Sequence, residues 1–76
     1  MHQEPIDSFA DALEPMTEDE VFSLLSRLER DSEKAEGEER DEVMARITLV
    51  TEEIERRYPG QVLAPYRAWK SRDPLA

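Results

Sequence analysis

Two stripes of apolar residues at helical spacing constrain the fold of this chain most strongly. Within each stripe the apolar side chains recur at i, i+3 or i+4, and i+7, which places them along one face of a helix with about 3.6 residues per turn. A charge-rich stretch separates the two stripes. Their members are Val21, Leu24, Leu25 and Leu28 in the first and Val43, Ile47, Val50 and Ile54 in the second. The pattern predicts an all-α fold.

Signals at the ends of the stripes predict an antiparallel hairpin of two helices, over about 18–35 and 39–57. Thr17 and Glu20 have the spacing of a capping box, in which a hydroxyl and a carboxylate each bond an unpaired backbone N–H. Gly37 is suited to the left-handed conformation that ends many helices. We therefore expect the turn of the hairpin to centre on this glycine.

A single long helix over 17–57 is the competing arrangement, because one glycine inside a helix costs only about 1 kcal/mol. On a straight helix the two stripes would roughly align, and such a helix could dimerise. The positions between the stripes on that face offer almost no apolar seam, since they are Ser32, Ala35, Glu39 and Glu42. This gap and the ordinary length of helices favour the hairpin.

Both ends of the chain carry further helical patterns. The acidic N-terminal arm, 1–16, is expected to be a short helix or an extended arm. Its apolar residues at helical spacing are Ile6, Phe9, Ala10 and Leu13. After a Pro-Gly pair, a short third helix is expected over about 62–70. One face of that helix would hold Val62, Leu63, Tyr66 and Trp69. We expect 17–70 to form one domain and 71–76 to form a flexible tail.

The small size of the chain limits how much apolar surface it can bury alone. A domain of 76 residues rarely gains more than about 3–5 kcal/mol from one core, and this chain has no cysteine to form a disulfide. We therefore expect a homodimer in which two hairpins form a four-helix bundle, with further burial from Phe9, Leu13, Tyr66 and Trp69. The residues assigned to self-association are Val21, Leu25, Leu28, Val43, Ile47, Val50 and Ile54.

The formal net charge of −9 is distributed unevenly along the chain. Residues 1–20 contain seven acidic and no basic residues, 21–42 contain eight acidic and four basic residues, and 43–76 contain four acidic and six basic residues. The acidic first part repels a phosphate backbone, which disfavours nucleic acid as the main partner. A protein partner with a basic or apolar surface fits this distribution better.

The sequence also predicts the cellular compartment in which the protein is found. No apolar run approaches the roughly 18 residues that a membrane-spanning helix needs. The first part of the chain lacks the basic and apolar regions of a secretory signal. These features predict a cytoplasmic protein that does not enter a membrane.

No residue cluster carries recognisable metal-binding chemistry. The one histidine is His2, so a Glu-x-x-His metal site cannot form on the predicted helices. Asp31, Glu33 and Glu42 match positions 1, 3 and 12 of a calcium-binding loop, but position 5 is Ala35 and the glycine falls one place late. The stretch is interpreted as a solvated acidic turn, and we expect no metal and no cofactor.

The carboxylates of the second predicted helix are interpreted as a solvated face. General acid or base work needs a pocket that separates the pKa values of such groups, and a small hairpin supplies none. Some of them have a base four residues later, an arrangement that adds about 0.2–0.5 kcal/mol per pair. The pairs are Glu42 with Arg46, Glu52 with Arg56, and Glu53 with Arg57, and Glu55 completes the face. We expect the protein not to be an enzyme.

The C-terminal segment mixes cations with aromatic rings, a combination that can bind nucleic acid through charge and stacking. Its members are Arg56, Arg57, Tyr58, Tyr66, Arg67, Trp69, Lys70 and Arg72. The favoured interpretation is structural: the rings close the open end of the hairpin, and the cations neutralise the acidic arm. Leu49 lies about 120 degrees from the nearer members of its stripe, so it is either a lone exposed leucine or part of a second contact surface.

The order of elements can be compared with that of a known family. Thr17-Glu18-Asp19-Glu20-Val21-Phe22 opens a helix, an acidic turn and a second helix follow, and Pro59-Gly60 precedes a late Trp69. This layout resembles the small acidic immunity proteins that neutralise colicin-type nucleases. That family carries paired tyrosines where this chain has Val62-Leu63-Ala64-Pro65-Tyr66, and this chain is too short for the family's last helix. The chain is not assigned to the family, which serves as a precedent for an acidic surface that occupies a basic groove.

The leading hypothesis is a non-enzymatic, small, acidic, helical protein that acts through protein–protein interaction, as an adaptor or regulatory subunit. The residues assigned to partner binding are Ile6, Phe9, Leu13, Leu49, Tyr66 and Trp69. The alternative is an acidic stoichiometric inhibitor or nucleic-acid mimic. Such a protein would block a basic groove of a nuclease or of another nucleic-acid-binding enzyme, and its binding would depend steeply on salt.

Overall fold

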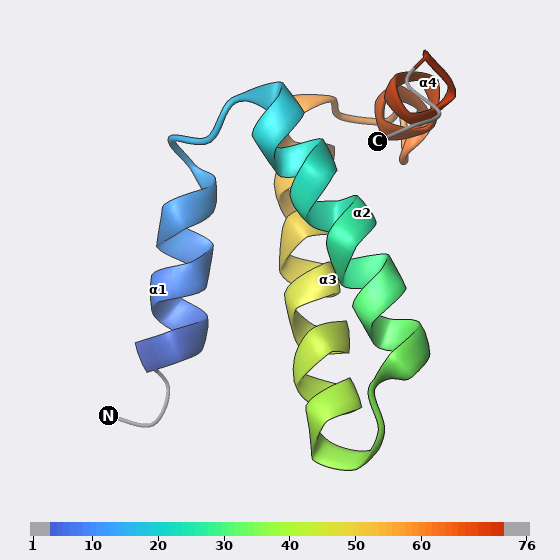
Figure 1. Ribbon diagram of the computed structural model, residues 1–76. Coiled ribbons are helices and arrows are strands. Elements are labelled where there is room, and N and C mark those ends of the chain that lie inside the picture. Colours follow the sequence, from blue (N-terminus) through green and yellow to red (C-terminus); the bar gives the residue numbers. More distant parts are fainter. Residues whose placement is uncertain (1–3, 73–76) are drawn as a thin grey trace.

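The computed structural model describes the backbone of residues 4–72 and the side chains of residues 8–72 (Figure 1). This part of the chain consists of helices and connecting turns, with no strand. The helices are α1 (Glu4–Leu13), α2 (Glu18–Lys34), α3 (Gly37–Arg57) and α4 (Ala64–Arg72). The prediction of an all-α fold is confirmed.

Helices α2 and α3 lie side by side and run in opposite directions (Figure 1). The predicted capping box starts α2, where the Thr17 hydroxyl accepts the Glu20 N–H at 3.2 Å and the Glu20 carboxylate accepts the Thr17 N–H at 2.8 Å. These two bonds satisfy backbone donors that the first turn of a helix leaves unpaired. The start of α2 is therefore encoded locally.

The turn between α2 and α3 differs in detail from the prediction. Ala35 ends α2 in an extended conformation, and Glu36 is also extended. Gly37 does have a left-handed φ of +62°, but it is the first residue of α3 and not the cap of α2. Because the chain leaves the helical conformation at Ala35, 17–57 do not form one long helix.

The core is closed within a single chain, because all four helices contribute to it. Each of its apolar side chains is at most 9% exposed. They are Leu13 from α1; Val21, Phe22, Leu25 and Leu28 from α2; Ala35 from the turn; Val43, Val50 and Ile54 from α3; and Tyr66 and Trp69 from α4. Full burial of such a side chain contributes about 1.5–3 kcal/mol, so the two terminal helices add substantially to the α2–α3 pair.

The N-terminal arm is a helix that packs mainly along α3 (Figure 1). Leu13 is 2% exposed. The Arg57 guanidinium of α3 donates hydrogen bonds to the carbonyl oxygens of Leu13 at 2.9 Å, Glu14 at 3.3 Å and Met16 at 2.9 Å. A cation is favourable here because the last carbonyls of a helix have no partner within the helix and carry partial negative charge. Arg57 therefore anchors the end of α1 to α3.

The third predicted helix begins later and ends later than expected. Val62 lies before α4, has a left-handed φ of +56° and is 66% exposed, so it does not join the predicted apolar face. Ser71 and Arg72 belong to α4, so the predicted flexible tail is wrong for these two residues. The remainder of that tail, 73–76, lies outside the described residues.

Candidate functional site

The residues assigned to self-association lie inside the molecule. Each of the six named here is at most 9% exposed: Val21, Leu25, Leu28, Val43, Val50 and Ile54. Ile47 is half-buried against the same core. These side chains cannot meet a second copy unless the core opens, because α1 and α4 cover the α2–α3 pair. A contact between copies that leaves this core closed would use other residues.

The residues assigned to partner binding are also mostly internal. Leu13, Tyr66 and Trp69 are buried in the core of one chain. Phe9 and Leu49 are half-buried, and they pack against the core. Leu49 lines a pocket together with Ala10 and Leu13 of α1, so it lies at the boundary between α1 and α3. The side chain of Ile6 lies outside the described side chains.

An aromatic cluster joins α4 to α2 and to the end of α3. Phe22 lies at its centre, with its ring centroid 5.7 Å from those of Tyr66 and Trp69 and 6.4 Å from that of Tyr58. Tilted and offset pairs at such distances add about 0.5–1.5 kcal/mol each beyond area burial. The rings thus close the open end of the α2–α3 pair, as the structural interpretation expected, and the buried faces of Tyr66 and Trp69 are not free to stack on bases.

Two acids of α2 accept hydrogen bonds from this cluster. The Trp69 indole N–H donates to Asp19 at 2.9 Å, and the Tyr66 hydroxyl donates to Glu29 at 2.8 Å. Burial of the phenol, together with its hydrogen bond to the Glu29 carboxylate, raises the pKa of Tyr66 to about 12. Lys70 lies 3.4 Å from the same carboxylate. These acids are therefore occupied in holding α4.

Glu53 corrects the interpretation of the α3 carboxylates as a solvated face, since it is only 8% exposed. Burial alone would raise the pKa of Glu53, but hydrogen bonds from Arg57 and Arg56 outweigh burial and hold this pKa below its usual value. Arg56 pairs with Glu53 and not with the predicted Glu52. The predicted pairs Glu42–Arg46 and Glu53–Arg57 do form.

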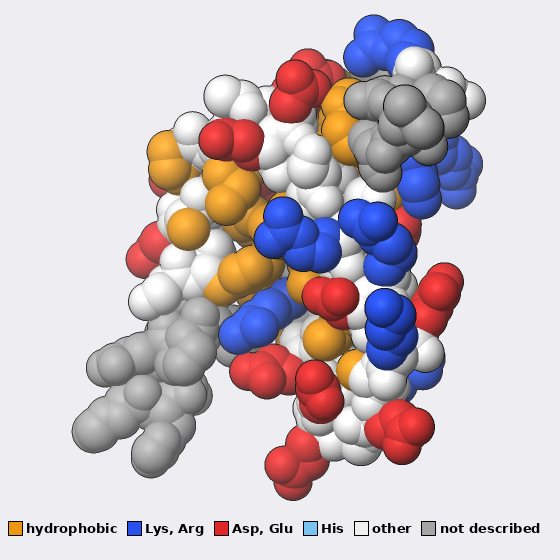
Figure 2. Space-filling view, in the orientation of Figure 1, with side chains coloured by type: hydrophobic (Ala, Val, Ile, Leu, Met, Phe, Trp, Pro, Cys, Tyr) orange, Lys and Arg blue, Asp and Glu red, His pale blue; other side chains and the backbone are white. Residues whose placement is uncertain are grey.

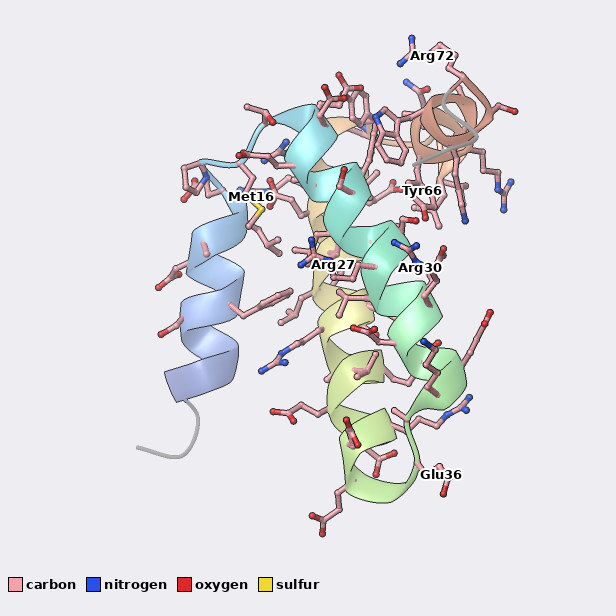
Figure 3. The ribbon with its side chains drawn as sticks, viewed as in Figure 1. Met16, Arg27, Arg30, Glu36, Tyr66 and Arg72 are labelled. Atoms are coloured by element: carbon pink, nitrogen blue, oxygen red, sulfur yellow. The ribbon has the colours of Figure 1, made fainter. Side chains whose placement is uncertain are left out.

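A surface pocket of about 360 Å³ lies beside α2. We call it the α2 groove, and its lining residues are Met16, Asp19, Glu20, Ser23, Leu24 and Arg27. Met16 and Leu24 are half-buried and rest on the core from outside. In Figure 3, Met16 and Arg27 lie on the side of α2 that faces α1. Figure 2 shows hydrophobic side chains gathered between α1 and α2, with Lys and Arg side chains along α2.

Sequence reasoning missed the α2 groove. The spacing of Leu24 places it in the first stripe and therefore predicts that it belongs to the core. It lies, however, at the edge of that stripe. Met16 precedes the capping box and fitted no helical pattern. The available signal was the spacing of Glu20, Leu24, Arg27 and Asp31, which places one leucine between charges on one face of α2.

Two further pockets are bordered by carboxylates. One, of about 230 Å³, lies between α1 and α3 beside Glu52 and Glu53. The other, of about 390 Å³, lies beside Val62 and Leu63 and is bordered by Glu52 and Glu55 of α3. The Glu55 carboxylate accepts the Gly60 N–H at 2.9 Å, so it supports the turn that leaves α3.

Among the described side chains, which are those of residues 8–72, no three His, Cys, Asp or Glu residues are placed to hold a metal ion together. None of the described helices combines the length and apolar character that crossing a bilayer requires. No protein-family model, no curated protein and no solved structure matches the chain.

Proposed function

We propose that the protein is a non-enzymatic helical interaction protein, an adaptor or regulatory subunit that self-associates and presents an acidic surface to a basic protein partner. The observation that carries this proposal is the α2 groove. The core closes within one chain, yet Met16 and Leu24 remain only half-covered beside charged residues. Partly exposed apolar side chains with a charged rim are typical of protein–protein contact surfaces.

The distribution of charge supports a basic partner. Asp11 near the end of α1, Glu14 just after it, and Glu18 at the start of α2 are exposed and lie close together along the chain. In a protein with net charge −9, such acids attract a basic surface over several ångströms and speed encounter with it. The α2–α3 turn adds further exposed acids at the opposite end, including Glu33, Glu36 and Glu38.

The described ionisable groups that are most enclosed serve the fold, which supports a non-enzymatic role. Glu53 is bonded to two arginines, and Tyr66 donates to Glu29. A general acid or base must instead reach a substrate from a pocket.

Self-association is tested by sedimentation equilibrium of the full chain over a range of micromolar concentrations. We expect a monomer–dimer equilibrium, in which the α2–α3 pairs of two copies meet through residues outside the closed core. A species that stays monomeric and unfolds cooperatively at these concentrations contradicts this part of the proposal.

Partner binding is tested by affinity capture from the native host, followed by titration of the identified protein in purified form. We expect Asp11→Asn combined with Glu14→Gln to weaken binding by about tenfold, because both changes remove exposed charge without burying any group. The matched control is Glu33→Gln combined with Glu38→Gln, which removes the same charge at the other end. Equal affinity for the two double variants contradicts a role for the acidic end.

A stoichiometric inhibitor of a nuclease or of another nucleic-acid-binding enzyme is the second candidate. The excess of exposed acids at both ends of the α2–α3 pair favours it, because these acids can occupy a basic groove that normally holds phosphates. In that case the captured protein is a basic enzyme whose activity falls at a one-to-one ratio. Its affinity should fall steeply with added salt, whereas an adaptor bound through apolar contacts would show a weak salt dependence.

A further inference from the structure

We infer that a second copy of this chain occupies the α2 groove, through antiparallel contact of the two α2 helices about a twofold axis beside Ser23 and Leu24. This inference rests on the self-association in the proposed function and names its surface. The core residues cannot supply that surface, because they are buried within one chain. The α2 groove is a surface where apolar side chains lie only half-covered next to charges of both signs.

The charges along the groove are self-complementary for antiparallel helices. Glu20 and Arg27 lie two turns apart on one face, about 10 Å along the axis, with Leu24 between them. A twofold axis midway between positions 23 and 24 places Glu20 of each copy opposite Arg27 of the other. The same axis places the small side chain of Ser23 opposite Leu24, which allows the helices to approach closely. A symmetric contact of this kind uses the same patch on both copies.

Other arrangements of the same two helices bring like charges together. Parallel pairing about an axis along the helices places Glu20 next to Glu20 of the second copy and Arg27 next to Arg27 of the second copy. An antiparallel contact shifted two residues along α2 places Glu20 opposite Asp31 of the second copy. Juxtaposed like charges disfavour a contact strongly. The distribution of charge therefore favours the antiparallel direction and disfavours this shifted register.

The side chains of Arg27 and Glu20 are available to form ion pairs between the two copies. Arg27 is exposed and forms no ion pair with any other described side chain. One oxygen of the Glu20 carboxylate accepts the Thr17 N–H in the capping box, which fixes the side chain in place. The spacing of Glu20, Leu24, Arg27 and Asp31 alternates four and three residues, as in the contact seam of a coiled coil.

Sedimentation equilibrium of matched variants tests the contact. Leu24→Asp should weaken the dimer by about a hundredfold, because it places a charge at the axis of the contact. Arg27→Glu should weaken it by about tenfold, because it faces Glu20 of the second copy. Glu20→Gln keeps the capping box and should weaken the dimer only severalfold. The control Arg30→Glu makes the same charge reversal on α2 outside the contact and should leave the dimer unchanged.

Helix content and cooperative unfolding of each variant are measured alongside, so that loss of the dimer is separated from loss of the fold. If the wild-type chain dimerises, Leu24→Asp leaves the dimer intact, and Arg27→Glu and Arg30→Glu have equal effects, the proposed contact is wrong. Self-association itself would still be supported. A wild-type chain that stays monomeric overturns both.

Disulfide trapping tests the same geometry independently, because the natural chain has no cysteine. In the proposed register each copy of position 23 lies half a residue step from the axis along the helix, so the two copies approach to a Cα distance that a disulfide can span. Ser23→Cys should therefore form a covalent dimer on mild oxidation. Thr48→Cys, on the exposed outer face of α3, is the control. Cross-linking that is equally fast for both variants, or faster for Thr48→Cys, overturns the proposed contact.

Discussion

At the scale of single residues, Arg57 joins three parts of the chain. Its guanidinium bonds the carbonyl oxygens of Leu13 and Met16, while its Nε lies 2.7 Å from the Glu53 carboxylate. Glu53 is nearly buried, so its charge depends on this arginine. Breaking a buried charge pair by removing one member costs more than the pair itself contributes, because the other charge is left without a partner.

Arg57→Gln should lower the free energy of unfolding by about 2–3 kcal/mol, because it removes the anchor of α1 and leaves Glu53 with Arg56 alone. Equilibrium urea unfolding measures the change. The control is Arg56→Gln, whose side chain is 61% exposed and should cost less than about 1 kcal/mol. Equal losses for the two variants would show that the carbonyl contacts contribute nothing.

Tyr66 gives the protein a stability change in the alkaline range. Its pKa is about 12 in the folded chain, against an ordinary value of 10.0, because burial and the Glu29 carboxylate favour the neutral phenol. The unfolded chain therefore loses this proton first as the pH rises. The contribution of Tyr66 to the free energy of unfolding should be constant below pH about 10. It should fall as the pH rises from about 10 toward 12.

Unfolding measured at a series of alkaline pH values tests this expectation, with Tyr66→Phe as the reference chain. The phenylalanine variant should be about 1 kcal/mol less stable at neutral pH, since it lacks the hydrogen bond to Glu29. The difference between the two chains should shrink between pH 10 and 12. A constant difference across this range would contradict the raised pKa.

At the scale of the elements, the link between α3 and α4 contains a strained position. Val62 has a left-handed φ of +56°, a conformation that β-branched residues rarely adopt, and its side chain is 66% exposed. The exposed side chain gives up little burial if it is replaced. A substitution at this position therefore changes the backbone strain with little change in packing.

Val62→Asn should raise the free energy of unfolding by about 0.5–1 kcal/mol, because asparagine tolerates the left-handed region. Thermal and urea unfolding measure the gain. The converse control is Gly37→Ala at φ +62°, where an added Cβ meets no atom within 4 Å. That change should cost about 1 kcal/mol through backbone strain alone. A loss of stability in Val62→Asn would show that this valine packs usefully.

Helix α1 should be less protected than the α2–α3 pair. It is short, packs mainly on one neighbour, and depends on Leu13 and the Arg57 anchor. Elements with few buried contacts open locally at lower free energy than the core does.

Amide hydrogen exchange of Leu13→Ala tests whether α1 opens separately from the α2–α3 pair. Exchange in 8–13 should accelerate by at least about tenfold, because the change removes buried apolar contacts of α1. The central amides of α3 should keep most of their protection relative to α1. Equal acceleration throughout the chain would show that α1 and the α2–α3 pair unfold as one unit.

At the scale of the whole molecule, the net charge of −9 opposes the compact state. Salt should stabilise the chain, because the screening length falls from about 30 Å at about 0.01 M to about 10 Å at about 0.1 M. We expect the melting temperature to rise over this range at fixed chain concentration. Sodium and potassium chloride should act alike, and a melting temperature that falls with either salt would contradict self-repulsion.

What the sequence predicted depended on how local the signals were. The start of α2 was predictable because Thr17 and Glu20 interact within one turn. The burial of Glu53 was not, because it depends on Arg57 binding carbonyl groups more than forty residues earlier in the chain. The left-handed Val62 left no mark in the sequence, since valine usually avoids that conformation, so the start of α4 was placed too early.

The sequence allowed the types of residue in the candidate site to be predicted, but not the position of the site. The sequence shows which charged residues are present, but periodicity assigns every residue of the apolar stripes to one interior or one interface. Leu24 and Leu25 are neighbours in the chain, yet Leu25 is fully buried and Leu24 is half-buried in the α2 groove. This division depends on where α1 and α4 pack, which the spacing of one helix cannot specify.

Trp69 has an optical consequence. It is the one tryptophan in the chain, and its indole is 8% exposed, contacts the Phe22 ring and donates to Asp19. Emission from this ring therefore reports directly on whether α4 is seated on α2. Release of α4 would shift the emission to longer wavelength as water reaches the indole, so the native chain carries its own fluorescent sensor of that event.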